Sequence, residues 1–203
     1  MKVNMLPVGL YMENCYVVHE KGHVLIVDPG GHPEIISSVI EKDEKVEAIL
    51  LTHGHEDHTG AVDELVRHFH CPVYMSVKDF PLVKESTSHQ HPFAQPVTSK
   101  ILPVEKIMDI DGFHIQTILT PGHTHGSVCY IIENCIFSGD TLFAGSIGRT
   151  DLTDSSMEEM RESLKIVSKF PKDDTVLPGH GGATTIREEL QSNYYLIHSS
   201  LYE

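Results

Sequence analysis

Side chains of the kinds that bind metals gather in one short stretch of this sequence. The segment from residue 50 to residue 60 reads LLTHGHEDHTG, and its candidate ligands are His53, His55, Asp57 and His58. His53 and His55 are two residues apart, so in an extended chain their side chains point to the same side, whereas Asp57 and His58 begin the helix that follows. Gly54 lets the backbone pass close to a cation. One stretch can therefore supply ligands to two neighbouring cations.

Three further residues of the same kinds follow apolar strands, and each stands beside a glycine. His123 lies in TPGHT, Asp140 in SGDT and His180 in PGHGG. Strand ends that meet at one rim of a two-sheet sandwich are where a fold can collect ligands from distant parts of the chain. Together, the seven candidate ligand residues predict a metal centre. The weaker interpretation is that the seven are unrelated polar residues that only happen to follow strands.

Histidine is unusually abundant, with 15 of the 203 residues, whereas tryptophan is absent. Imidazole is the commonest metal ligand in proteins, so the excess is consistent with a metal centre, although only five histidines stand at predicted ligand positions. His125, His89 and His91 can line the cleft or its entrance, but loop positions outside the ligand set are the simpler interpretation. The excess is therefore only partly functional.

The overall charge excludes several classes of partner. Lys and Arg number 15 against 29 Asp and Glu, which gives a formal net charge of −14. Such a surface repels phosphate backbones and anionic membranes, so we expect neither nucleic acid nor membrane as a partner. No apolar stretch reaches the roughly 18 residues of a membrane span, and no leader-like segment opens the chain. The four cysteines lack a C-x-x-C pair, which favours reduced thiols and a cytoplasmic protein.

The predicted elements fall into two similar halves. The first half, about residues 1–105, contains three short strands and then a βαβ unit, followed by a proline-containing, loop-rich stretch over 80–104. Its strands are expected at 2–7, 14–19, 24–27, 48–51 and 72–75, and its helices at 33–40 and 57–69. The second half, 106–203, has strands expected at 106–110, 114–119, 128–132, 135–138 and 175–177, and helices at 155–167 and 184–200. We predict one α/β domain with two mixed sheets face to face and helices outside.

The motif H-x-H-x-D-H at 53–58, with G-H at 123, G-D at 140 and G-H at 180, resembles the metallo-β-lactamase fold superfamily, and the resemblance spans residues 24–180. It implies an αββα sandwich with a dinuclear site in the cleft. The implied ligands are His53, His55 and His123 for one metal, Asp57, His58 and His180 for the other, and Asp140 as the bridge. Asp140 and the lack of a leader argue against an exported class B β-lactamase.

Within that superfamily, the run GDTLFAGSIGRTD at 139–151 is similar to the short glyoxalase II-like, or hydroxyacylglutathione hydrolase-like, enzymes. Full-length glyoxalase II has a further helical region that holds glutathione, whereas only 23 residues follow His180 here, since 203 − 180 = 23. Strict glutathione specificity is therefore not expected. The same run also resembles the persulfide dioxygenases, in which one iron occupies the positions that match His53, His123 and Asp140.

The ligand set suits hydrolysis. Two cations about 3.5–4 Å apart lower the pKa of a bridging water toward about 7, and one of them can polarise a thioester carbonyl. We therefore predict a dinuclear metal-dependent thioester hydrolase in which Asp140 bridges the metals and Asp57 can orient the hydroxide. Zinc suits the imidazole-rich set, although iron and manganese also fit mixed N/O ligands. The alternatives are an iron-dependent sulfur oxygenase and, less favoured by the charge, a nucleic-acid-processing hydrolase.

Several residues near the motifs have two interpretations. Asp28, at a strand end, can fix a ligand histidine or cap its own turn, and Thr52 and Thr124 have the same possibility of contacting a ligand. Arg149 can contact an anionic substrate group or form a buried ion pair with Asp151. These residues are expected around the site rather than in the ligand set.

Overall fold

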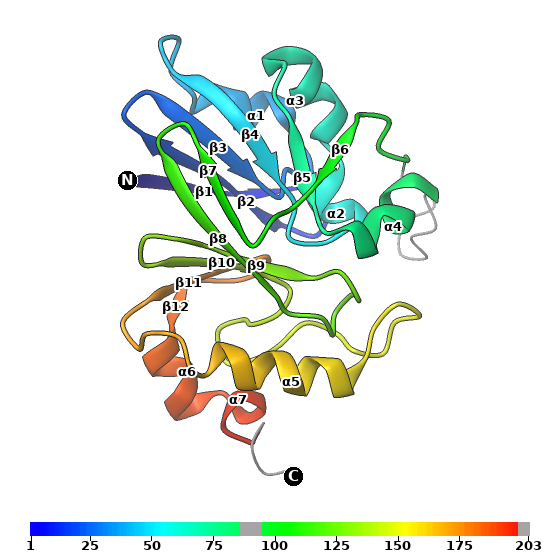
Figure 1. Cartoon of the computed structure of the whole chain (residues 1–203), viewed down its shortest axis with the longest axis vertical. Coiled ribbons are helices and arrows are strands. Elements are labelled where there is room, and N and C mark those ends of the chain that lie inside the picture. The colour runs from blue at the N-terminus through cyan, green and yellow to red at the C-terminus, as the bar shows by residue number, and fades with distance from the viewer. Residues whose placement is uncertain (86–94, 199–203) are drawn as a thin grey trace.

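Two six-stranded β-sheets packed face to face form the centre of the molecule, and helices cover their outer faces (Figure 1). The computed structural model describes residues 1–85 and 95–198. His89 and His91 lie outside the described residues. The predicted αββα sandwich is confirmed.

The first sheet is built from residues 2–103 in the strand order β1-β2-β3-β4-β5-β6. β1, β2 and β3 are antiparallel neighbours, whereas β3 to β6 run parallel, so the sheet is mixed. Its strands are β1 (Lys2–Val8), β2 (Glu13–Glu20), β3 (His23–Val27), β4 (Lys45–Leu50), β5 (Val73–Met75) and β6 (Ile101–Pro103).

The second sheet is built from residues 107–185 in the order β7-β8-β9-β10-β11-β12. β10 and β11 are parallel neighbours, and the other pairs of neighbouring strands named here are antiparallel. The strands are β7 (Ile107–Ile110), β8 (Phe113–Leu119), β9 (Val128–Ile132), β10 (Cys135–Gly139), β11 (Thr175–Pro178) and β12 (Thr184–Thr185). Residues 111 and 112 form the predicted turn between β7 and β8.

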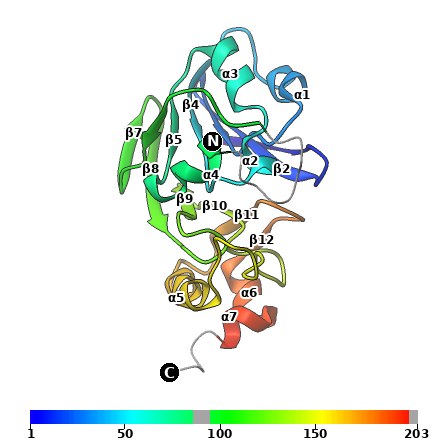
Figure 2. The ribbon, with the colours of Figure 1, turned by 90° about the vertical axis from the view of Figure 1, so that its right-hand side faces the viewer.

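Short helices cover each sheet on its outer face, as the side view also shows (Figure 2). The first sheet carries α1 (Pro33–Ser38) and α3 (Val62–Phe69), and the second carries α5 (Met157–Val167), α6 (Ile186–Ser192) and α7 (Tyr194–His198). Between β4 and β6 lie α2 (Glu56–Thr59), the 3₁₀ turn η1 (Val77–Asp79) and α4 (Phe80–Glu85). Among the described residues no helix has the length and apolar character needed to cross a membrane.

The central strands are apolar at nearly every position because both of their faces are covered. In β3, Leu25 and Val27 pack between the sheets with Phe137, whereas Val24 and Ile26 pack toward the helices of the first sheet. The strands that lead to the site are therefore buried on both faces.

Three predicted elements differ from the structure. The helix expected over 57–69 is divided into α2 and α3 at Ala61, whose backbone leaves the helical region and whose N–H donates to the Pro29 carbonyl at 2.9 Å instead of to the preceding turn. The loop-rich stretch contains α4 and β6. Of the helix expected over 184–200, residues 199 and 200 lie outside the described residues, and 184–198 form β12, α6 and α7. The helices are interrupted at Asn193, whose buried Oδ1 accepts hydrogen bonds from Tyr195 N and Leu196 N.

Candidate metal centre

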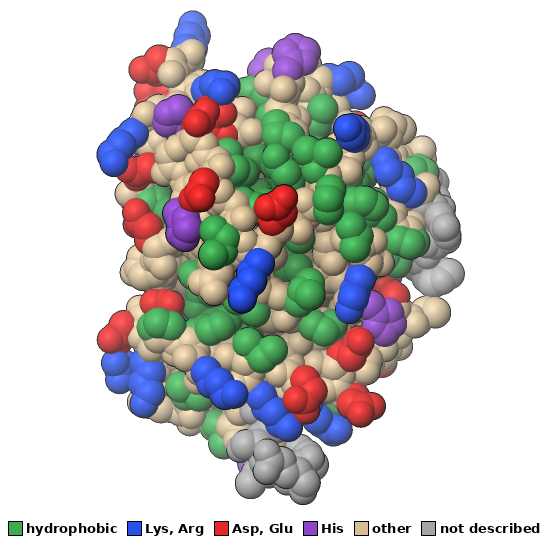
Figure 3. All heavy atoms as spheres, viewed as in Figure 1, with side chains coloured by type: hydrophobic (Ala, Val, Ile, Leu, Met, Phe, Trp, Pro, Cys, Tyr) green, Lys and Arg blue, Asp and Glu red, His purple; other side chains and the backbone are tan. Residues whose placement is uncertain are grey.

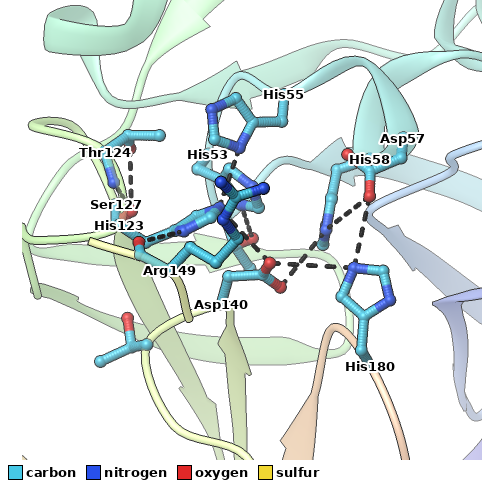
Figure 4. A network of polar contacts seen from close by, with 12 residues as sticks. His53, His55, Asp57, His58, His123, Thr124, Ser127, Asp140, Arg149 and His180 are labelled. Atoms are coloured by element: carbon cyan, nitrogen blue, oxygen red, sulfur yellow. Dashed lines mark hydrogen bonds and ion pairs between the residues drawn. The ribbon is translucent and has the colours of Figure 1, made fainter. Parts of the chain in front are cut away.

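All seven predicted ligand residues come together at one end of the sandwich (Figure 4). They follow the carboxyl ends of four strands: β4 leads to His53, His55, Asp57 and His58, β8 to His123, β10 to Asp140 and β11 to His180. The glycines beside them permit this convergence. A Cβ on Gly179 would overlap the Asp140 carboxylate and the His58 ring, and one on Gly139 would overlap the Thr52 side chain.

One ligand group consists of three buried histidines, His53, His55 and His123, whose ring nitrogens lie within 4.8 Å of one another. His55 Nδ1 is 2.9 Å from His123 Nε2. Burial lowers the pKa of His53 well below its ordinary value and also lowers that of His123, which keeps both imidazoles neutral. Neutral rings present the nitrogen lone pairs that a metal requires.

A second group consists of Asp57, His58 and His180, whose ligand atoms likewise lie within 4.8 Å of one another. Asp57 Oδ2 is 3.3 Å from His180 Nε2 and 3.9 Å from His58 Nε2. Burial opposes the charged form of His58, but the carboxylates of Asp57, Asp140 and Asp28 outweigh it and raise the pKa of His58. The surplus of negative charge suits a bound cation.

Asp140 lies between the two groups. Its Oδ1 is 3.4 Å from His58 Nε2, and its Oδ2 is 3.3 Å from His123 Nε2 and 3.8 Å from His180 Nε2. Although burial disfavours the charge, the neighbouring imidazoles hold the pKa of Asp140 well below its usual range. One carboxylate therefore faces both groups, which is the position that a bridging ligand requires.

The arrangement of unpaired polar atoms fits metal ions. His53 Nε2, His58 Nε2 and Asp140 Oδ1 are buried and have no hydrogen-bond partner in the described part of the chain. Leaving one such atom unpaired costs about 1–3 kcal/mol. Cations between the groups would satisfy all three atoms, and the mixture of imidazole and carboxylate donors suits zinc, iron or manganese.

Asp28 contacts the ligand residues rather than only capping its own turn. Its Oδ2 is 3.0 Å from His58 Nδ1, and its two oxygens accept hydrogen bonds from the Thr52 N–H at 2.7 Å and hydroxyl at 2.6 Å. A proton on His58 Nδ1 that is donated to Asp28 leaves the lone pair of His58 Nε2 free for a cation held together with Asp57 and His180. Thr52 Oγ1 is also 3.1 Å from His53 Nδ1.

Two predictions for residues around the site are corrected or refined. The Arg149–Asp151 pair forms, with Nε 2.9 Å from Oδ1, but a buried pair was the wrong expectation because the two side chains are 64% and 71% exposed. The Arg149 carbonyl instead accepts a hydrogen bond from His123 Nδ1 at 2.9 Å. His125 is outside the ligand set, as expected, with its Nδ1 2.7 Å from Glu159 Oε2 on the surface.

Three acidic residues beside the ligands were missed from the sequence. Asp79 is buried in η1 and accepts hydrogen bonds from Gly54 N at 3.0 Å and Thr124 Oγ1 at 2.7 Å. Asp154 Oδ2 is 3.2 Å from His55 Nε2. Glu13 is fully buried 3.7 Å from His58 Nδ1. No local pattern distinguishes these acids from surface carboxylates, because their partners lie far away in the sequence.

The site opens into a pocket of about 340 Å³. Tyr11, from the turn between β1 and β2, and Phe143 and Ile147, after Asp140, give the pocket an apolar side. Arg149 places a cation at the same opening. The pocket therefore suits a small substrate with both an apolar and an anionic portion.

The family model of the metallo-beta-lactamase superfamily matches residues 8–180. The chain belongs to this superfamily, as the sequence motifs indicated, and its buried His and Asp groups can bind metal ions.

Two curated relatives match nearly the whole chain. The probable metallo-hydrolase YqgX of Bacillus subtilis is 35% identical over 207 residues, covering 97% of this chain and 98% of the relative. The hydroxyacylglutathione hydrolase GloC of Haemophilus influenzae is 34% identical over 208 residues, with the same two coverages. These relatives place the chain among metal-dependent hydrolases.

Solved structures show the same fold. The BLEG-1 B3 metallo-beta-lactamase has a TM-score of 0.87 and 34% identity, covering 96% of this chain and 99% of that one. TTHA1623 in a di-iron-bound form has a TM-score of 0.86 and 33% identity, covering 95% and 99%. ETHE1 from Myxococcus xanthus, at 22% identity and a TM-score of 0.77 over 100% and 92% of the chains, shows the fold alone.

Proposed function

We propose that this protein is a dinuclear metal-dependent hydrolase of small thioesters. The observation that carries the proposal is the position of Asp140, whose two oxygens face imidazoles of both ligand groups. Such a carboxylate can hold two cations side by side. The likeness to GloC supports the thioester class, and the free thiols Cys15, Cys71, Cys129 and Cys135 support a reducing, cytoplasmic setting.

His53, His55 and His123 would hold one cation, Asp57, His58 and His180 the other, and Asp140 would bridge them. Bound there, two cations would lower the pKa of a water toward about 7 and polarise an acyl carbonyl. We propose zinc as the resident metal because imidazoles dominate the set, with iron as the alternative that the di-iron form of TTHA1623 suggests. The reaction adds water across the acyl C–S bond and gives a carboxylate and a thiol.

Other residues of the site would orient the attacking water, exclude bulk water and attract the substrate. Asp57 is ionised because His58 and His180 lower its pKa despite burial, so it can accept a hydrogen bond from the attacking water and orient it. Tyr11, Phe143 and Ile147 form the apolar side of the pocket and exclude bulk water from the acyl group. Arg149 can attract an anionic group on the substrate toward an otherwise acidic protein.

The deciding experiment compares reactions at known metal content. We expect protein loaded with two zinc ions per chain to release thiol from S-lactoylglutathione and from an acyl N-acetylcysteamine thioester, with the rate rising up to two equivalents. Oxygen uptake with glutathione persulfide at one iron per chain, without thiol release from either thioester, would favour the dioxygenase instead. Nitrocefin turnover exceeding thioester turnover would place this chain with the β-lactamases.

A further inference from the structure

His180 is the most exposed of the seven predicted ligand residues. Its side chain is 28% exposed, whereas none of the other six exceeds 16%. It stands in the segment PGHGG at 178–182, between Gly179 and Gly181, and Gly181 has a φ of 82°. Glycine backbones have more conformational freedom than those of other residues, so this loop does not by itself fix the direction of the imidazole. Contacts from another part of the fold must supply that constraint.

Asn14, in β2 of the first sheet, makes three hydrogen bonds to this loop, which follows β11 of the second sheet (Figure 1). Its backbone N–H donates to the Gly179 carbonyl at 2.7 Å. Its side-chain Nδ2 donates to the Pro178 carbonyl at 3.0 Å and to the Gly181 carbonyl at 2.8 Å. Both side-chain partners are carbonyls, so only the NH2 group of the amide can satisfy them. One residue of the first sheet therefore holds the chain on both sides of His180.

Burial makes these hydrogen bonds hard to replace. Charged side chains on the open face of the molecule in Figure 3 can exchange hydrogen bonds with water, whereas Asn14 is only 3% exposed. Tyr16, two residues further along β2, donates its hydroxyl to the Pro178 carbonyl at 2.7 Å and so holds the loop before His180. The Asn14 amide holds the loop after His180 as well, through the Gly181 carbonyl.

We propose that Asn14 is a positioning residue for the proposed hydrolysis, because it holds the carbonyls on both sides of His180 and so directs this imidazole toward the second ligand group. His180 Nε2 is 3.3 Å from Asp57 Oδ2 and 3.8 Å from Asp140 Oδ2 (Figure 4). Metal–ligand distances hold to within about 0.2 Å, so a loop shift of about 1 Å takes the ring out of the ligand set. The inference rests on the proposed function, since it concerns the cation that His180 would share with Asp57 and His58.

The test is metal binding by the full chain, measured by competition with a chromophoric chelator. In Asn14→Ala we expect the affinity of the second ligand group for zinc to fall about 10- to 100-fold, and that of the three-histidine group to change less than about twofold. When the chain is loaded with cobalt(II) in place of zinc, its visible absorption should change in the same component that His180→Ala removes.

A double-variant comparison assigns the effect to His180. In the His180→Ala background, the further change Asn14→Ala should leave zinc affinity unchanged, because the ligand that Asn14 positions is already absent. The same loss in both backgrounds would overturn the proposal, and so would an unaltered zinc affinity of the second group in Asn14→Ala. Because the readout is binding, a chain that binds two cations without cleaving thioesters would refute the proposed reaction, while the selective loss would still support the role of Asn14.

Three further variants separate positioning from stability. Tyr16→Phe removes a hydrogen bond to the same loop but leaves the contact with Gly181, so it should lower the urea midpoint of the metal-free chain without changing zinc affinity. Asn134→Ala makes the same substitution at an exposed position between β9 and β10 and should change neither quantity. Asn14→Leu keeps nearly the volume of the side chain without its donor, so it should weaken zinc binding as Asn14→Ala does. Equal losses of zinc affinity in Tyr16→Phe and Asn14→Ala, or wild-type affinity in Asn14→Leu, would overturn the proposal.

Discussion

At the scale of single residues, Asp140 is the side chain whose loss should matter most. Asp140→Ala removes the carboxylate that faces both ligand groups, so metal content should fall from about two ions per chain to one or fewer and thioester hydrolysis should be lost. Elemental analysis of protein purified without chelator checks this. His125→Ala is the matched control, because His125 pairs with Glu159 on the surface and should leave metal content unchanged.

Asp79 should set the affinity of the three-histidine group without touching a metal. It joins Gly54, between His53 and His55, to Thr124, beside His123, so Asp79→Asn removes one acceptor and loosens both loops. We expect metal affinity at this group to fall about 10- to 100-fold while the second group is unchanged. Competition with a chromophoric chelator measures both affinities.

The exposed Asp109→Asn is the control for this change, since Asp109 pairs with the exposed His114, its neighbour across β7 and β8, and neither belongs to the ligand groups. A uniform loss of affinity at both ligand groups, or none at all, would show that Asp79 does not act on the three-histidine group.

The ligands could be predicted from the sequence, whereas the acids beside them could not. His53 to His58 form a dense local motif, and His123, Asp140 and His180 share the pattern of a strand end next to a glycine. Asp79 and Asp154 contact residues 25 and 99 positions away in the chain, so their roles depend on tertiary contacts. Long-range pairing of this kind leaves no periodic trace in a sequence.

At the scale of elements, the buried strands were predicted well because both of their faces are apolar. The helix boundaries were predicted less well, since they depend on side-chain hydrogen bonds. Asn193 illustrates this: its amide donates to the Ser146 carbonyl and to Glu189, and its oxygen accepts from the first turn of α7. The hydrophobic pattern continues across Asn193, so the interruption between α6 and α7 was missed.

The start of α6 is fixed by a capping box. Thr185 Oγ1 accepts a hydrogen bond from Glu188 N at 3.2 Å, and the Glu188 carboxylate accepts one from Thr185 N at 3.1 Å. Thr185→Ala should lower the free energy of unfolding by about 1 kcal/mol, measured by urea denaturation. The exposed Thr153→Ala should change it by less than about 0.5 kcal/mol. Equal effects of the two substitutions would contradict the cap.

At the scale of the whole molecule, Asp63 makes stability depend on acid. Partial burial raises its pKa, but hydrogen bonds from Ser99 and Thr98 outweigh this and lower the pKa to about 2 from 3.8. Because the folded-state pKa is the lower one, the stabilisation is complete above about pH 4 and is lost as pH falls toward 2.

This contribution is about 1 kcal/mol after allowance for solvent screening. Urea denaturation of metal-free protein should therefore show Asp63→Asn to be about 1 kcal/mol less stable than the wild type at pH 6, with the difference narrowing by pH 3. A difference that stays constant over this range would show that the carboxylate of Asp63 is not the group responsible.

The two sheets meet through their apolar inner faces, and the ligands are divided between them. His53, His55, Asp57 and His58 follow the first sheet, whereas His123, Asp140 and His180 follow strands of the second. Each bound cation would therefore cross-link the two halves, and binding only to the folded state would add about 2.7 kcal/mol per site when free metal is 100 times its dissociation constant. The melting temperature of this protein then becomes a reporter of free metal concentration.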